Sequence, residues 1–319
     1  MREFFDLSIP HSSADSLSGE DFARVREVFA ALLANGFSFG ALDYAARLPL
    51  RPKDLCRLPL APLRAALPTV DGAADCTAVI AGRLAGSGRA VLRRRDARAL
   101  VGGVAGRKRA RADGAIGDDN GAPNMRPRSM RVLTRITVTL EPTVVGVGGN
   151  GGSAGGGPRP SRVTAALQDP LLSSWDVVAV EPADAEGLAA AIASGVVDIF
   201  VLDMTAGRLP FTLRAADVDA ALRSGGAFEL KYAPAIRDAS MRRAFFATAA
   251  ALLRLTRGRG VVLSSAARDG LEIRGPRDAA SIAAIAGLST EAAFDAMSAT
   301  AAGVVARAQL RKRGGVQLL

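Results

Sequence analysis

The chain has 319 residues, of which 49% are hydrophobic, so it can bury one large core or two smaller ones. Its formal net charge of +10 favours an anionic partner such as nucleic acid. Two cysteines argue against a disulfide framework, and no apolar run is long enough for a membrane span or a signal peptide. The single histidine, His11, argues against histidine-dependent hydrolases and metal centres, and we expect it in a solvated loop.

Two segments have the composition of insertions into a folded domain. Residues 73–128 are rich in Ala, Gly and Arg and contain twelve Lys/Arg against five Asp. Residues 146–160 form a Gly-rich tract without hydrophobic periodicity. We expect the first to be disordered and the second to be flexible. The remainder has roughly 250 residues, the size typical of a (β/α)8 barrel.

Strand and helix signals alternate along this remainder. A strand over 4–9 precedes a helix over 19–34, for which Ser18 is the expected N-cap. Further strands are predicted over 37–42, 132–140, 177–180, 197–202, 227–230 and 261–264. Further helices are predicted over 186–194, 238–255, 276–286 and 290–310. The pattern indicates an α/β protein with a parallel sheet.

The length favours one domain, residues 1–319, folded as a single (β/α) TIM-like barrel of seven or eight strands with two low-complexity insertions. An open, doubly wound sheet is the alternative. The chain has no Gly-x-Gly-x-x-Gly between a strand and a helix and no Walker-type Gly-Lys-Ser/Thr. We therefore expect no nucleotide cofactor.

From residue 131 onward the sequence resembles the thirty-kilodalton protein subunit family of eukaryotic ribonuclease P and RNase MRP. The segments that carry the resemblance are 133–137 (LTRIT), 175–180 (WDVVAV), 209–211 (LPF), 227–238 (AFELKYAPAIRD), 240–243 (SMRR), 263–267 (LSSAA) and 271–276 (LEIRGP). Segments 5–7 (FDL) and 67–72 (LPTVDG) match its N-terminal landmarks.

The resemblance implies a barrel related to metal-dependent phosphoesterases. It also implies a non-catalytic role, in which the protein supports a catalytic RNA that removes 5′ leaders from precursor tRNA. The implied partners are the ribonuclease P RNA, other subunits including a small α/β protein, and precursor tRNA indirectly, without a membrane. The implied location is the nucleus, in particular the nucleolus, and residues 106–111 (GRKRAR) are typical of a nuclear localisation patch.

A metal-dependent phosphoesterase on the same barrel is the rival interpretation. Catalytic groups of such barrels follow the carboxyl ends of strands, where this chain has Asp6, Asp43, Asp203, Glu229, Ser264 and Ser265. Asp6-Leu7-Ser8 stands where a His-x-His pair is expected in the related enzymes. We therefore predict no catalytic and no metal-binding residue, and we expect the carboxylates to cap helices or to pair with arginines.

Basic residues give the stronger functional signal. Residues 231–277 contain ten Lys/Arg against three acids. Those that fall in two consecutive strand-to-helix loops are the candidate RNA-binding residues, because guanidinium groups bind phosphate oxygens and such loops share one face of a barrel. They are Lys231, Arg237, Arg242, Arg243, Arg268, Arg274 and Arg277. Intramolecular pairs, such as Arg237 with Asp238 or Arg274 with Glu229, are the alternative. Arg307, Arg311, Lys312 and Arg313 either contact RNA or complement the end of the last helix.

Overall fold

The computed structural model describes residues 3–17, 19–67, 130–142 and 160–313. The two expected insertions lie outside these ranges, except for Pro160, which is the first residue of a helix. Their predicted disorder and flexibility therefore stay predictions.

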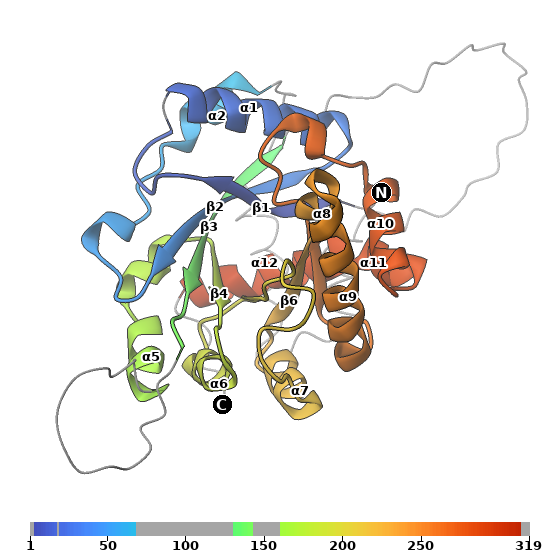
Figure 1. Ribbon diagram of the computed structural model, residues 1–319. Coiled ribbons are helices and arrows are strands. Elements are labelled where there is room, and N and C mark those ends of the chain that lie inside the picture. Colours follow the sequence, from blue (N-terminus) through green and yellow to red (C-terminus); the bar gives the residue numbers. More distant parts are fainter. Residues whose placement is uncertain (1–2, 18, 68–129, 143–159, 314–319) are drawn as a thin grey trace, which may run out of the picture.

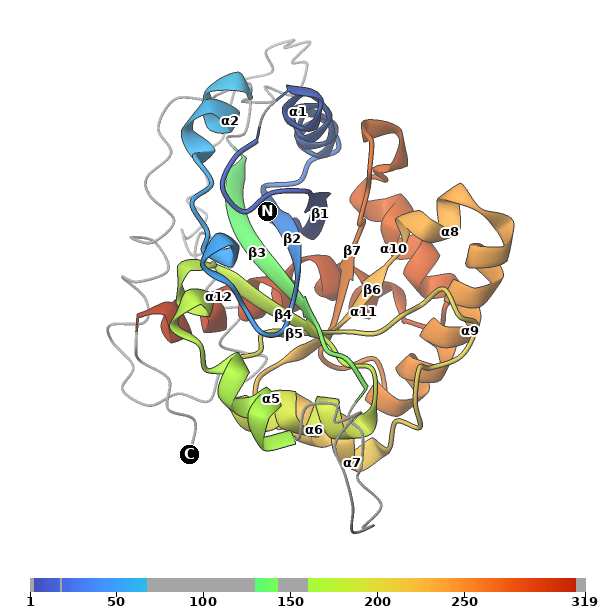
Figure 2. The same cartoon turned by 60° about the vertical axis from the view of Figure 1, so that its left-hand side comes forward.

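Seven parallel strands form one nearly closed barrel in the described part of the chain, as expected (Figures 1 and 2). They pair in chain order, each with the next. They are β1 (Phe5–His11), β2 (Phe39–Arg47), β3 (Arg131–Thr139), β4 (Val177–Glu181), β5 (Ile199–Val201), β6 (Ala227–Lys231) and β7 (Val261–Ser264).

Helices surround this barrel and follow its strands in sequence (Figure 1). They are α1 (Gly19–Ala34), α2 (Leu60–Ala66), α5 (Pro160–Leu167), α6 (Ala185–Ser194), α7 (Ala215–Arg223), α8 (Ala233–Arg237), α9 (Ala239–Thr256), α10 (Pro276–Ile285), α11 (Thr290–Met297) and α12 (Ala299–Lys312). Short 3-10 turns are η1 (Pro52–Asp54), η2 (Pro170–Ser174) and η3 (Gly270–Glu272). Asp238 caps α9 as expected, since its carboxylate accepts hydrogen bonds from the backbone N–H groups of Ser240 and Met241.

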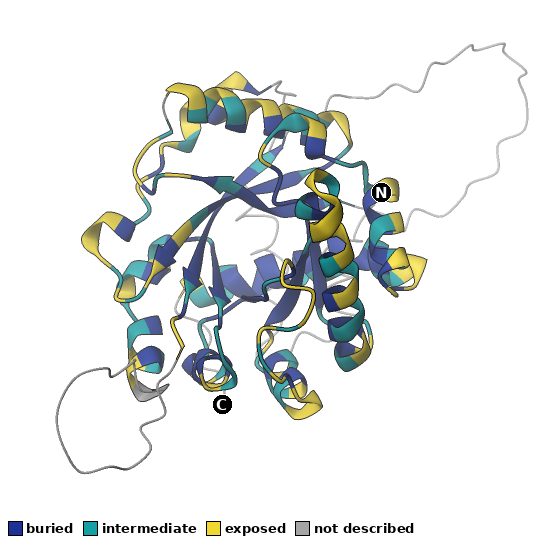
Figure 3. Ribbon diagram, viewed as in Figure 1, coloured by how far each residue is buried: buried dark blue, intermediate teal, exposed yellow. Residues whose placement is uncertain are grey.

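Strand periodicity divides the apolar residues into two cores. One core lies between the barrel and its outer helices, which turn their buried faces inward (Figure 3). The other fills the barrel and includes Phe5, Leu7, Phe39 and Val262. Residues from α12, such as Val305, belong to this inner core, and α12 passes behind the strands in Figure 1. The helix therefore closes the floor of the barrel, at the amino ends of the strands.

The seam between β1 and β7 is closed by side chains, since the described ladders join only consecutive strands. The backbone N–H of Ser265 donates to the carboxylate of Asp6 over 3.1 Å. Arg24 of α1 donates to the carbonyl oxygen of Arg268 over 3.3 Å. These contacts join β1 and α1 to the loop after β7 at the carboxyl end of the barrel, which we call the mouth.

Two expected elements have wrong bounds. The second strand was predicted over 37–42 but runs from Phe39 to Arg47, because its full length pairs with β3 from Arg131 to Thr139. The last helix was predicted over 290–310 but is broken at Ser298, whose φ of −125° and ψ of −86° are not helical. This break redirects the chain from the outer layer to the floor of the barrel.

His11 is the last residue of β1 and only 8% exposed, so its expected place in a solvated loop is wrong. No helix in the described ranges combines the length and the apolar character needed to cross a membrane.

Candidate functional site

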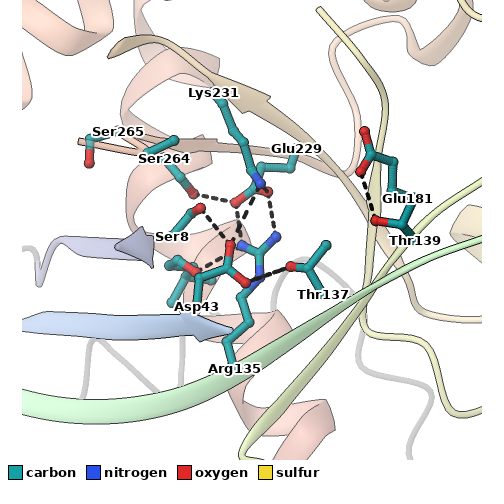
Figure 4. A network of polar contacts seen from close by, with 12 residues as sticks. Ser8, Asp43, Arg135, Thr137, Thr139, Glu181, Glu229, Lys231, Ser264 and Ser265 are labelled. Atoms are coloured by element: carbon teal, nitrogen blue, oxygen red, sulfur yellow. Dashed lines mark hydrogen bonds and ion pairs between the residues drawn. The ribbon is translucent and has the colours of Figure 1, made fainter. Parts of the chain in front are cut away.

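A buried arginine lies at the centre of the barrel mouth. Arg135 extends inward from β3 and is fully buried, and it forms a two-pronged ion pair with Glu229 of β6 (Figure 4). The two guanidinium nitrogens lie 2.6 and 2.7 Å from the two carboxylate oxygens. Arg135 also donates to the carbonyl oxygen of Leu7 over 2.8 Å. A single side chain thus joins three strands, which explains how a charge can be buried here.

A second carboxylate completes this network from the other side. Asp43 of β2 lies 3.3 Å from Nε of Arg135 and accepts hydrogen bonds from Thr137 over 2.6 Å and Ser8 over 2.8 Å. Lys231 places its ammonium group 3.6 Å from both Asp43 and Glu229, and 24% of its side chain is exposed at the mouth (Figure 4). The mouth is therefore filled by an internal ion-pair network.

The network controls the ionisation of its carboxylates. Burial alone would raise the pKa of Asp43 and of Glu229, but the charges of Arg135 and Lys231 outweigh burial and hold both pKa values below the usual range. Burial opposes the charge of Arg135 as well, yet the two carboxylates raise its pKa. Asp43, Glu229 and Arg135 are thus all charged.

Asp6 behaves differently. It is buried beside the same network, and one of its oxygens accepts hydrogen bonds from the backbone N–H groups of Ser8 and Ser265. Its other oxygen, Oδ2, has no partner among the described residues. Burial raises the pKa of Asp6 to about 6, against the hydrogen bonds from Ser265 and Ser8. Asp6 therefore lies at the seam without a salt bridge to any described residue.

This arrangement does not fit the metal centre of a phosphoesterase. The guanidinium of Arg135 lies between Asp43 and Glu229 and pairs with the carboxylate oxygens that a metal ion would need as ligands. No group of three or more His, Cys, Asp or Glu side chains in the described part of the chain is placed to hold a metal. Burial lowers the pKa of His11 to about 4, and neither ring nitrogen has a partner there. Asp203 accepts hydrogen bonds from the backbone and the hydroxyl of Thr205, and none of the described ion pairs joins it to this network.

The candidate basic residues lie on two loops that contact each other, as the barrel interpretation required. The loop after β6 carries Arg237, whose guanidinium donates to Glu272 and, over 2.7 Å, to the carbonyl oxygen of Ala266 in the loop after β7. The backbone N–H of Arg268 donates to the same Glu272 carboxylate over 2.7 Å. The hydrogen bond from the Arg274 N–H to the Tyr232 hydroxyl, 3.1 Å long, adds a second link.

Four of the seven candidates make internal contacts. Lys231 belongs to the mouth network, and Arg237 pairs with Glu272 rather than with Asp238. Arg242 donates to the carbonyl oxygen of Ala235, at the end of α8, over 2.8 Å. Arg274 donates to the carbonyl oxygens of Leu271 and Ile273 and does not pair with Glu229, whose partner is Arg135. Both intramolecular pairs suggested by the sequence are therefore wrong.

The other three candidates, Arg243, Arg268 and Arg277, are exposed and make no salt bridge to any described residue. They lie on the two linked loops and on the first turns of α9 and α10. We call them the mouth arginines. The basic residues of the last helix differ, because Arg307 and Arg311 pair with buried Asp198 and Lys312 pairs with Asp176.

Sequence reasoning missed the central role of Arg135. The signal was present, since Arg135 shares the inward parity of Leu133 and Thr137 within a strand that is buried along most of its length. Glu272 was counted only as an opposing charge, although it is 8% exposed and joins the two loops.

Comparison with known proteins finds a family that matches the carboxyl-terminal part of the chain. The model of the family described as "RNase P subunit p30" matches residues 160–313. Mouse "Ribonuclease P protein subunit p30" is 38% identical over 187 residues, which cover 59% of this chain and 63% of the mouse protein. Arabidopsis thaliana "Protein GAMETOPHYTE DEFECTIVE 1" is 27% identical over 314 residues, which cover 97% of this chain and 45% of the plant protein. The chain therefore spans about half to two thirds of these relatives.

A chain in a cryo-EM structure of archaeal ribonuclease P with mature tRNA has 12% identity and a TM-score of 0.49, with 99% of this chain and 97% of that chain covered. That likeness is too distant to support a functional conclusion. The sequence resemblance is supported by the family match and the mouse relative: residues 160–313 match the RNase P subunit p30 family.

Proposed function

We propose that this protein is a non-catalytic, RNA-binding subunit of ribonuclease P, which supports the removal of 5′ leaders from precursor tRNA by the catalytic RNA. The family match supports the assignment to this particle. The filled mouth supports the non-catalytic role, because Arg135 and Lys231 already neutralise Asp43 and Glu229. These carboxylates are then poorly placed to activate water or to bind a metal.

One observation carries the RNA-binding part of the proposal. Arg243, Arg268 and Arg277 are exposed, make no salt bridge to the described residues, and lie in or next to the two segments that Arg237 and Glu272 hold together. A group of exposed guanidinium forks suits the phosphates of a folded RNA. The chain has only 5% aromatic residues, so stacking on unpaired bases is not expected to dominate.

The proposed partners follow from the particle. They are the ribonuclease P RNA, other protein subunits including a small α/β protein, and precursor tRNA indirectly through the RNA. RNase MRP is a second proposed particle, and the nucleus, in particular the nucleolus, is the proposed location. Sequencing the RNA that copurifies with the endogenous protein tests both particles, and fluorescence of the tagged protein tests the location.

Salt-dependent binding to ribonuclease P RNA transcribed in vitro tests the RNA contact. Each single change Arg243→Ala, Arg268→Ala or Arg277→Ala should reduce the slope of log affinity against log salt by about one, because each lost phosphate contact releases fewer counterions. Arg223→Ala is the control, since Arg223 is exposed at the carboxyl end of α7, which lies towards the floor and away from the mouth. Unchanged slopes in all three variants, with a weakened control, would place the RNA face elsewhere.

A further inference from the structure

The basic segment 231–277 divides between two ends of the barrel. Arg254, Arg257 and Arg259 lie at the carboxyl end of α9, whose 18 residues extend about 27 Å from the mouth loops. Arg259 pairs with Asp219 over 3.3 Å. The exposed side chains of Arg254 and Arg257 make no hydrogen bond or salt bridge to any described residue. Two positive charges thus remain free on the side of the barrel opposite the mouth.

These two arginines border a hollow of about 490 Å³. Leu253 and Leu288 contribute apolar side chains to its lining, and both are largely buried. The complete set of lining residues is Ala250, Leu253, Arg254, Arg257, Gly258, Ala286, Gly287, Leu288, Ser289 and Ala292, none of which is acidic. The hollow therefore combines an apolar surface with two cationic groups that make no hydrogen bond or salt bridge within the described part of the chain.

Arg257 adopts a backbone conformation that is unfavourable for residues other than glycine. It ends α9 with a φ of 52° and a ψ of 36°, in the left-handed region where a glycine would meet no strain. Gly258, with a φ of 68°, follows it directly. The turn itself thus gives no reason for an arginine at this position.

One face of α9 connects the hollow with the mouth. Arg243, Ala247, Ala250, Arg254 and Arg257 follow one another at spacings of four and three residues, so they share one side of the helix. Ala250 is half-buried and the other four are exposed. Exposed residues mark the outward side of α9 in Figure 3. We call this row the α9 ridge: it has arginines at both ends and small alanines between them.

We propose that the α9 ridge continues the RNA-binding surface from the mouth arginines to the hollow, and that the hollow binds a nucleotide of the RNA backbone. Arg254 and Arg257 donate to phosphate oxygens, and the apolar lining packs against the ribose or base. The alanines let the RNA approach the helix closely between these contacts. This inference rests on the proposed RNA-binding function and adds a second contact region to it.

The test uses the full-length chain and in vitro transcribed ribonuclease P RNA over a series of salt concentrations. The double variant Arg254→Gln/Arg257→Gln should lower the salt slope by about two and weaken binding roughly tenfold at moderate salt. Arg259→Gln is the matched control, because it removes a neighbouring arginine that already has an internal partner. It should leave the slope unchanged, and all variants should melt like the parent protein.

A second pair of variants tests the ridge between its ends. Ala247→Glu places a negative charge between the two arginine groups and should weaken RNA binding, whereas Ala247→Gln, of similar size, should do so much less. If the double variant and Ala247→Glu bind like the parent while the mouth variants lose slope, the inference is wrong and the proposed function stands. If the mouth variants also bind unchanged, both are wrong. If the double variant loses a copurifying protein without a change in RNA slope, the hollow is a protein contact and the inference again fails.

Discussion

The mouth and the floor of the barrel both bury arginine, but their charge balance is opposite. At the mouth, Arg135 and the half-buried Lys231 face three buried carboxylates, those of Asp6, Asp43 and Glu229. At the floor, two arginines of α12 face a single buried carboxylate. The buried network at the mouth therefore has an excess of acid and the buried cluster at the floor an excess of base. The difference shows which buried carboxylates have enough positive charge next to them and which do not.

The floor contacts fix α12 under the barrel. Arg307 bonds to the carboxylate of Asp198 and, over 2.8 and 2.9 Å, to the carbonyl oxygens of Val197 and Gly195. Arg311 lies 2.9 Å from the other oxygen of Asp198. Because Asp198 has two cations, the loss of one leaves it partly compensated. No such redundancy protects Glu229, whose close partner is Arg135 and whose other cation, Lys231, is 3.6 Å away.

The largest effect is expected from Arg135→Met. This change leaves the buried carboxylates of Asp43 and Glu229 without their main counterion, so it should lower the free energy of unfolding by about 3–5 kcal/mol. Chemical denaturation followed by circular dichroism measures this loss. The double change Arg135→Met/Glu229→Leu should recover part of it, because one stranded charge is removed. A loss below about 1 kcal/mol for the single variant would mean that the network contributes little to stability.

A smaller loss is expected at the floor. Arg307→Met removes hydrogen bonds to a carboxylate and two carbonyl groups but leaves Arg311 on Asp198, so we expect a loss of about 2–3 kcal/mol. The same denaturation experiment measures it. If Arg307→Met destabilises more than Arg135→Met, the redundancy at the floor does not operate.

The sequence predicted most of the fold because its signals are local. Apolar runs and caps such as Asp238 identified seven strands and the start of α9. The pairing of Arg135 with Glu229 joins residues 94 positions apart, and nothing in either local pattern identifies its partner. For the same reason the sequence suggested an ion pair between Arg237 and its neighbour Asp238. In the folded chain Arg237 instead pairs with Glu272, 35 residues away. The helical pattern continues through Ser298, but the helix breaks there because α12 packs into the inner core of the barrel. This packing is a tertiary contact, which local periodicity does not predict.

An effect of opposite sign is expected from Asp6→Asn. Burial raises the folded-state pKa of Asp6 from 3.8 to about 6, so the folded protein holds a proton that the unfolded chain releases. The resulting stabilisation is complete below pH 3.8 and is lost as the pH rises through about 6; above that pH the buried, ionised carboxylate makes folding less favourable.

Asparagine keeps an oxygen to accept the N–H groups of Ser8 and Ser265 and carries no charge. Asp6→Asn should therefore raise the free energy of unfolding by about 3 kcal/mol at pH 7.5, since each unit of pKa shift corresponds to about 1.4 kcal/mol. Near pH 3.5 the two proteins should be equally stable. Urea denaturation across this pH range measures the difference. Asp43→Asn is the control, because Asp43 is stabilised in its charged form, so this change should destabilise the protein at neutral pH. A gain for Asp6→Asn that does not depend on pH would show that the amide acts through packing or new hydrogen bonds, and that the mouth holds no uncompensated acid.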